Sequence, residues 1–211
     1  MNDAMWREDI EQLKNELPNL HNDFFYMGNE DEFFGRIENL QRSLWEMGAY
    51  DIVLEMARIV ATAGDAHTAL LLPQNYRLPF DCYPFAEGLY ITATDEANKE
   101  LLNAKILEIG ETGTAEVYGA ITEITPHENM QFVLSCLPKT VTCVDILYGL
   151  GIVEYVDSVD MTIMDSDGNT ARKTIQPVKY AEYRGVKPKI SNLPLYRQRE
   201  DQFYWNALHD G

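Results

Sequence analysis

The stretch Gly64-Asp65-Ala66-His67-Thr68-Ala69-Leu70-Leu71-Leu72-Pro73 marks the point where the apolar pattern of this chain changes. Before it, apolar residues recur every three or four positions, which is the period of an amphipathic helix. From Thr68 to Leu72 the pattern is nearly continuous and ends at a proline, which is typical of a short strand. We therefore predict a helical first third, followed by a part that contains strands.

Three amphipathic helices are predicted before this stretch. The first ends at Pro18, the second at Gly48, and the third runs from about Asp51 to Ala63, with Gly64 as its C-terminal stop. Their apolar faces contain Trp6, Ile10, Leu13, Leu17, Phe33, Phe34, Ile37, Leu40, Leu44, Met47, Ile52, Val53, Met56, Ile59 and Val60. Helices joined by short turns bury such faces against one another, so residues 1–75 are expected to form a three-helix bundle.

After the change of pattern, residues 74–85 contain Pro79 and Pro84 and are interpreted as an irregular boundary. A second unit, residues 84–178, mixes both element types. We predict strands at 88–94, 104–110, 159–164 and 171–177, and helices at 114–124, 128–137 and 144–152. The predicted fold class is therefore α+β, with residues 179–211 as a connector that carries Phe203, Tyr204 and Trp205 near its end.

Composition limits the function. The 211 residues include 34 acidic and 17 basic side chains, for a formal net charge of −17. Nucleic acids and anionic membranes require clustered basic residues, so neither is an expected partner, whereas a cationic or neutral partner is favoured. The first residues lack the basic start and apolar run of a signal peptide, and no stretch approaches the ~20 apolar residues of a membrane span. A cytoplasmic location is favoured.

Two candidate catalytic pairs follow from local spacing. Asp65 and His67 are suited to acid–base chemistry or to half of a metal site, but zinc needs three or four ligands. The alternative is a structural turn in which Asp65 and Thr68 bond nearby backbone groups. Ser135 and Lys139, four residues apart, match a serine–lysine nucleophile pair only if the helix continues through Pro138.

Two further motifs favour structural roles. The cysteines Cys82, Cys136 and Cys143 match no zinc or redox spacing and are interpreted as free thiols. Asp165-Ser-Asp-Gly-Asn169 faintly resembles a calcium loop, but position twelve is Gln176 where a glutamate is required. A hairpin turn explains this composition better. No metal and no cofactor is expected.

The order of these elements resembles a known family. Residues 6–72, with the string Gly64–Leu70, resemble the N-terminal domain of bacterial proteins in the C-terminal-processing (tail-specific, tricorn-like) serine peptidase family. Residues 88–177 resemble their PDZ-like domain, in which 99–110 is a helical turn leading to a strand and 161–175 is the closing hairpin. Residues 128–157 are a helical insertion relative to a minimal PDZ domain.

The resemblance implies a peptide groove. A PDZ domain adds a peptide as a strand to a sheet edge, so the edge is expected at Gly88, Leu89, Tyr90 and Ile91. Val117 and Ile121, on the following helix, are expected to form the opposite wall. The resemblance carries over no catalytic residue, and Asp65, His67 and Thr68 form a motif of unassigned role.

Three functions are compatible with these sequence features. The chain is interpreted first as the substrate-recruiting or regulatory portion of a serine peptidase, inactive without a catalytic core that would follow residue 211. The second hypothesis is an independent peptide-binding protein that recognises a peptide or a protein C-terminus. The third is a self-contained hydrolase that uses Ser135 or His67.

Overall fold

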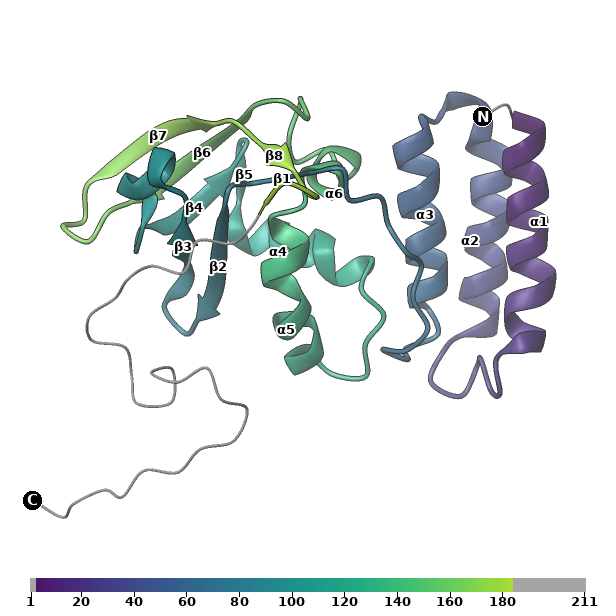
Figure 1. Ribbon diagram of the computed structural model, residues 1–211. Helices are drawn as coiled ribbons and strands as arrows, with labels where there is room; N and C mark the ends of the chain where they lie inside the picture. Colours follow the sequence, from purple (N-terminus) through teal and green to yellow (C-terminus); the bar gives the residue numbers. More distant parts are fainter. Residues whose placement is uncertain (1–2, 184–211) are drawn as a thin grey trace, which may run out of the picture.

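The computed structural model describes residues 3–183, and the fold is α+β, as predicted. Three helices, α1 (Asp3–Leu20), α2 (Glu30–Ser43) and α3 (Ala49–Ala61), stand side by side as a bundle, and a sheet with its own helices forms the other half (Figure 1). The side chain of Asn29 caps α2 by accepting the Glu32 N–H, and Asp51 accepts the Gly48 N–H at the start of α3.

The bundle encloses its own apolar core. Phe33, Ile37, Ile10 and Ile59 have no exposed surface, so the predicted helical faces do meet one another. Phe33 makes edge-to-face contacts with the rings of Phe24, Phe25 and Phe34 at centroid distances of 5.0–5.7 Å. A short 3₁₀ helix, η1 (Leu44–Glu46), extends α2.

The second half is built on an antiparallel sheet in the order β2-β3-β4-β6-β7. Its strands are β2 (Phe80–Phe85), β3 (Gly88–Thr94), β4 (Lys105–Ile109), β6 (Val159–Met164) and β7 (Thr170–Ile175). β5 (Thr112–Gly113) pairs with β4, and β1 (Tyr76–Arg77) pairs with β8 (Val178–Lys179). The 3₁₀ helix η2 (Glu96–Leu101) links β3 to β4.

Helices α4 (Thr114–Glu123), α5 (Met130–Val141) and α6 (Val144–Gly149) lie between the sheet and the bundle (Figure 1). Their apolar faces and the inner face of the sheet share one core, in which Leu89, Ile106, Val117 and Ile121 are fully buried. The alternation predicted for residues 159–164 is confirmed, because Val159, Met161 and Ile163 face this core.

Helix α3 joins the two halves. Leu54 and Ala57 of α3 pack with Ile124, Cys143 and Ile146 in a third buried cluster. At the edge of this contact, Arg58 Nε lies 3.2 Å from Glu123 Oε2. The bundle therefore rests on the helices of the second half and not on its sheet.

Asp145 forms the polar part of the same junction. It is 1% exposed, and its carboxylate accepts hydrogen bonds from the Tyr50 hydroxyl of α3 and from the Asn75 and Tyr76 backbone N–H groups, at 2.7–3.0 Å. The Asn75 side-chain amide donates a fourth bond at 2.9 Å. One buried carboxylate thus joins α3, the segment leading into β1, and α6.

Several predicted boundaries are wrong. Residues 68–72 form no strand; Leu70 and Leu72 pack at the junction while Leu71 is 94% exposed. Residues 74–85 are not irregular, because they contain β1 and β2. Pro84 is tolerated there because β2 lies at the edge of the sheet within residues 3–183, where a strand needs no outward N–H.

Two prolines do not end their helices where predicted. Pro18 lies inside the last turn of α1, and Pro138 lies inside α5, which continues to Val141. Leu137 and Val141, on either side of Pro138, are buried, and the Thr142 hydroxyl donates to the Pro138 carbonyl at 3.0 Å.

Two further observations concern the extent of the chain. None of the helices within residues 3–183 combines the length and apolarity needed to cross a membrane. The predicted connector lies outside the described residues from position 184 onward, and with it Phe203, Tyr204 and Trp205.

Candidate functional site

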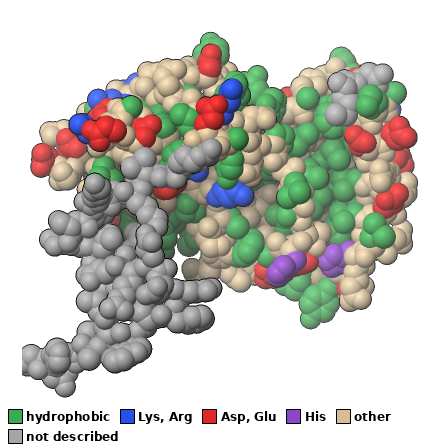
Figure 2. All heavy atoms as spheres, viewed as in Figure 1, with side chains coloured by type: hydrophobic (Ala, Val, Ile, Leu, Met, Phe, Trp, Pro, Cys, Tyr) green, Lys and Arg blue, Asp and Glu red, His purple; other side chains and the backbone are tan. Residues whose placement is uncertain are grey.

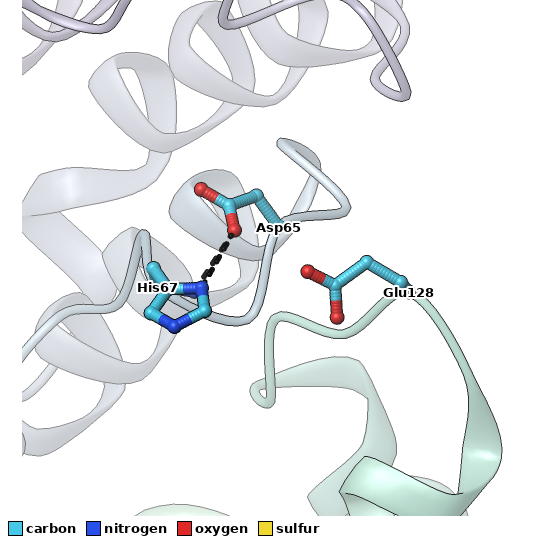
Figure 3. A group of neighbouring side chains, drawn as sticks. All are labelled: Asp65, His67 and Glu128. Carbon is cyan, nitrogen blue, oxygen red and sulfur yellow. Dashed lines mark hydrogen bonds and ion pairs between the residues drawn. The ribbon is translucent and has the colours of Figure 1, made fainter.

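The Gly64–Thr68 motif lies where the end of α3 approaches the loop between α4 and α5. Gly64 has a positive φ of 64° and turns the chain out of the helix. Figure 3 shows Asp65 and His67 on this turn, with Glu128 facing them from the opposite loop. Figure 2 shows histidine side chains beside acidic ones on the surface at this point, between the bundle and the sheet half.

Asp65 is the centre of the group. Its Oδ1 accepts the His67 backbone N–H at 3.0 Å and its Oδ2 accepts the Thr68 hydroxyl at 2.7 Å. His21, which follows α1, lies with Nε2 3.2 Å from Asp65 Oδ2. The His67 N–H, followed by the Thr68 hydroxyl and His21, lowers the pKa of Asp65 far below its ordinary value. Asp65 is therefore a carboxylate at any physiological pH.

The two histidines differ in exposure and in role. His21 Nδ1 accepts the Asp23 N–H at 3.1 Å, so the proton of its neutral ring resides on Nε2, which faces Asp65. The His67 side chain is 94% exposed, with its Nδ1 3.4 Å from Asp65 Oδ1. His21 therefore anchors the carboxylate, and His67 presents its Nε2 to solvent.

Glu128 completes a possible set of metal ligands. One donor atom each from Asp65, His67 and Glu128 lie within 4.8 Å of one another. Glu128 Oε1 accepts the Ala66 N–H at 3.1 Å, and both oxygens of Asp65 already accept hydrogen bonds. The contacts of these carboxylates are explained without an ion, and the set is better described as an Asp–His pair braced by Glu128.

The sequence patterns predicted Asp65, His67 and Thr68 but not His21 or Glu128. His21 is 44 residues from Asp65, and Glu128 is 62 residues from Ala66. No local spacing links such positions, since packing of α1 and of the α4–α5 loop against the end of α3 brings them together. The predicted backbone role is confirmed for Asp65 by its bond to the His67 N–H, but the Thr68 hydroxyl donates to the Asp65 carboxylate and not to a backbone group.

The peptide groove predicted at Gly88, Leu89, Tyr90 and Ile91 is not a free edge. β3 pairs with β2 on one side and with β4 on the other. Leu89 and Ile91 are buried in the core, and the predicted wall residues Val117 and Ile121 lie in the same core with no exposed surface. The space between β3 and α4 is filled with side chains, so this prediction is wrong.

β2 is the edge that adjoins a helix. The start of β2 is covered, because the Leu78 N–H donates to the Thr142 carbonyl at 2.8 Å and Cys82 Sγ lies 3.9 Å from the Pro138 carbonyl oxygen. Further along, Tyr83 and Phe85 are about half exposed, with ring centroids 4.8 Å apart. The accessible part of the edge is therefore the segment 83–85.

The remaining candidates have structural roles. Ser135 and Lys139 share α5, but the Ser135 hydroxyl donates to the Phe132 carbonyl at 2.7 Å. Asp165 accepts the N–H groups of Asp167 and Asn169 within the β6–β7 turn. Burial, with a smaller contribution from Asp81, raises the pKa of the Cys82 thiol to about 12, which is the opposite of an activated thiol.

Comparisons with known proteins identify relatives of this fold. No family model and no curated protein matches the chain. Its fold is similar to part of CPAF, a chlamydial serine protease. The structure of mature CPAF complexed with lactacystin matches with a TM-score of 0.58 and 12% identity, over 84% of this chain and 35% of that chain.

Two other CPAF structures agree. A serine-to-alanine mutant gives a TM-score of 0.57 at 13% identity over 84% of this chain and 33% of that one, and mature CPAF alone gives 0.55 at 13% identity over 84% and 34%. This chain thus spans about a third of the CPAF chains. The likeness to CPAF is one of fold alone.

Proposed function

We propose that this chain is a portion of a serine peptidase-like protein, which recruits peptide segments and holds an Asp–His pair for a nucleophile outside residues 3–183. The observation that carries the proposal is the geometry of His67. Its exposed imidazole has Nδ1 3.4 Å from a carboxylate whose pKa is held far below its ordinary value. In Ser–His–Asp catalysis the carboxylate orients the imidazole and Nε2 takes the serine proton.

The described residues do not complete such a centre. Within residues 3–183, no serine or cysteine side chain is hydrogen-bonded to His67. The pair therefore performs no acyl transfer by itself, and the proposal includes that this portion is inactive alone. In the proposed centre Asp65 orients, His67 transfers the proton, and His21, Thr68 and Glu128 hold the turn.

Replacing His67 tests this proposal in the natural gene product. We expect the endogenous protein, isolated from native extract, to be heavier than 24.2 kDa and to react with a serine-directed fluorophosphonate probe. His67→Ala should slow that reaction about 10²–10⁴-fold, the usual contribution of a general base. The measurement is the labelling rate.

His127→Ala is the matched control, because the His127 ring contacts the Thr125 carbonyl and not Asp65. It should label like the unaltered protein. Equal labelling of the His67 and His127 variants would contradict the assigned role. A native species of 24.2 kDa that does not label would contradict the link to catalysis altogether.

An independent peptide-binding protein is the second candidate, and the accessible part of β2 favours it. A peptide lying along residues 83–85 would contact the exposed rings of Tyr83 and Phe85. Because Pro84 has no N–H to offer an added strand, these ring contacts and not strand pairing would carry the binding. Glu87 adjoins this edge and the net charge is −17, so an internal peptide segment suits the edge better than a terminal carboxylate.

Tyr83→Ala should weaken binding of a fluorescent extended peptide about fivefold, because part of its apolar contact is lost. Fluorescence anisotropy with the purified chain measures the affinity. Lys173→Ala, on the β7 edge at the far side of the sheet, should leave binding unchanged. Loss of affinity in the Lys173 variant alone would place the peptide on the opposite edge and contradict this candidate.

A further inference from the structure

A cavity of about 800 Å³ lies between the start of α3 and the end of the sheet where β4, β5, β6 and β7 meet. The bundle contributes the first residues of α3, and the second half contributes the β4–β5 turn and the loop after α6. Its lining includes Asp51, Glu111, Tyr148, Glu154, Tyr155 and Arg172. Its volume is in the range of small-ligand sites, and it shares no residue with the Asp65–His67 group.

The cavity is strongly acidic. Asp51, Glu111, Glu154 and Asp160 line it, against a single lining cation, Arg172. That guanidinium already forms ion pairs, since one of its terminal nitrogens lies 3.1 Å from Asp160 Oδ2 and 3.9 Å from Glu111 Oε1. Within residues 3–183, Asp51 and Glu154 form no ion pair.

The partial positive charge at the start of α3 would repel a cation, but a carboxylate of the same helix compensates for it. The N-terminus of a helix carries a partial positive charge. Asp51 compensates for it, because its Oδ2 accepts the Gly48 N–H at 3.0 Å. Glu154 accepts a hydrogen bond from a neutral group, the Tyr155 hydroxyl at 2.7 Å, so its charge is available to a ligand.

Aromatic rings accompany the carboxylates. Tyr50 and Tyr148 form an edge-to-face pair with centroids 5.3 Å apart, and both line the cavity. Tyr148 is 40% exposed and Tyr155 56% exposed, so both side chains are accessible to a bound group. Tyrosine faces attract guanidinium and ammonium ions, and the nearby carboxylates add to that attraction.

We propose that this cavity binds the side chain of an arginine in an extended peptide. A planar guanidinium can pair with a carboxylate such as Glu154 and stack on a tyrosine ring at the same time. The compact ammonium group of lysine does this less well. Recognition of an arginine goes beyond the proposed function, because it names the chemistry of a recognised residue and holds with or without an associated nucleophile.

The test is an NMR titration of the purified chain with an N-acetylated, C-amidated Ala-Arg-Ala peptide. The same peptide with citrulline in place of arginine has almost the same shape without the charge. We expect amide shifts around Tyr148, Tyr155 and Gly110, and affinity for the citrulline peptide about tenfold weaker, as for loss of a charge-assisted hydrogen bond.

A pair of variants completes the test. Glu154→Gln should weaken arginine-peptide binding about tenfold. Glu100→Gln makes the same charge change on exposed η2, away from the cavity, and should leave binding unchanged. Equal affinity for the two peptides, shifts centred elsewhere, equal effects of the two variants, or no binding would each overturn the inference. None of these results bears on fluorophosphonate labelling, so failure here is distinct from failure of the proposed function.

Discussion

Asp145→Asn is expected to lower the free energy of unfolding by about 2–4 kcal/mol, the range for leaving buried hydrogen-bonding groups unsatisfied. The native carboxylate accepts from Tyr50, Asn75 and Tyr76, and Asp145 is 1% exposed. An asparagine places an NH₂ group against at least one of these donors. Chemical denaturation at neutral pH measures the loss, and the exposed Asp157→Asn is the control, with no expected change.

The same substitution should alter the pH dependence of stability. Burial alone raises the pKa of Asp145, but the hydrogen bonds from Tyr76, Asn75 and Tyr50 outweigh it and lower the pKa below its ordinary value. A carboxyl with a depressed folded-state pKa stabilises the protein above its unfolded pKa and loses that contribution as the pH falls through the folded value.

Between neutral pH and about pH 3, Asp145→Asn should therefore lose less stability than the unaltered protein. The pKa of Asp65 is also depressed, and this residue remains in both proteins, so some acid sensitivity persists. An identical pH dependence in the two proteins would mean that Asp145 is not ionised in the junction, contrary to the hydrogen bonds that it accepts.

Gly110→Ala is expected to destabilise the second half by about 3–5 kcal/mol, as for a substitution that combines backbone strain with a steric clash. Gly110 has a φ of 62°, and a Cβ there would overlap the Ile152 carbonyl oxygen, which is backbone and unable to rotate away. The Gly110 N–H also donates to the Asp160 carbonyl at 2.7 Å, so the turn has little freedom to shift.

Gly119→Ala is the matched control. Gly119 lies in α4 with nothing within 4 Å of an added Cβ, and alanine in a helix interior is favoured by about 0.5–1 kcal/mol. Thermal unfolding of the two variants should move in opposite directions. A Gly110 variant as stable as the unaltered protein would show that the β4–β5 turn can relax, contrary to the tight approach of residue 152.

Elements that bury their own repeating pattern were predictable. The helices of the bundle were located from apolar residues at helical spacing, and β3 spans residues 88–94 as predicted. The β6–β7 hairpin followed from alternation in its first strand and from the Asp-Gly-Asn turn after it. In each case one face of the element is buried in a core, and the spacing of its apolar residues predicts which face that is.

The edge strand was harder to predict. β2 contains Pro84 and few alternating residues, and its only strand partner within the described residues is β3. Since an edge strand is half solvated and makes hydrogen bonds on one side, its residues carry a weak pattern. The peptide groove expected from the PDZ-like resemblance falls on core residues such as Leu89 and Val117, because β2 and β4 pair with the two sides of β3.

The sequence by itself determined the α+β class, the helical bundle, the strands β3, β4, β6 and β7, and the turn that carries Asp65 and His67. Only the tertiary structure decided that His21 and Glu128 join that turn, that Asp145 connects the two halves, and that an acidic cavity forms beside Tyr148. The physical reason is that amphipathic periodicity is local, whereas these groups come from positions tens of residues apart, and only the packing of α3 against α6 and the α4–α5 loop brings them within contact.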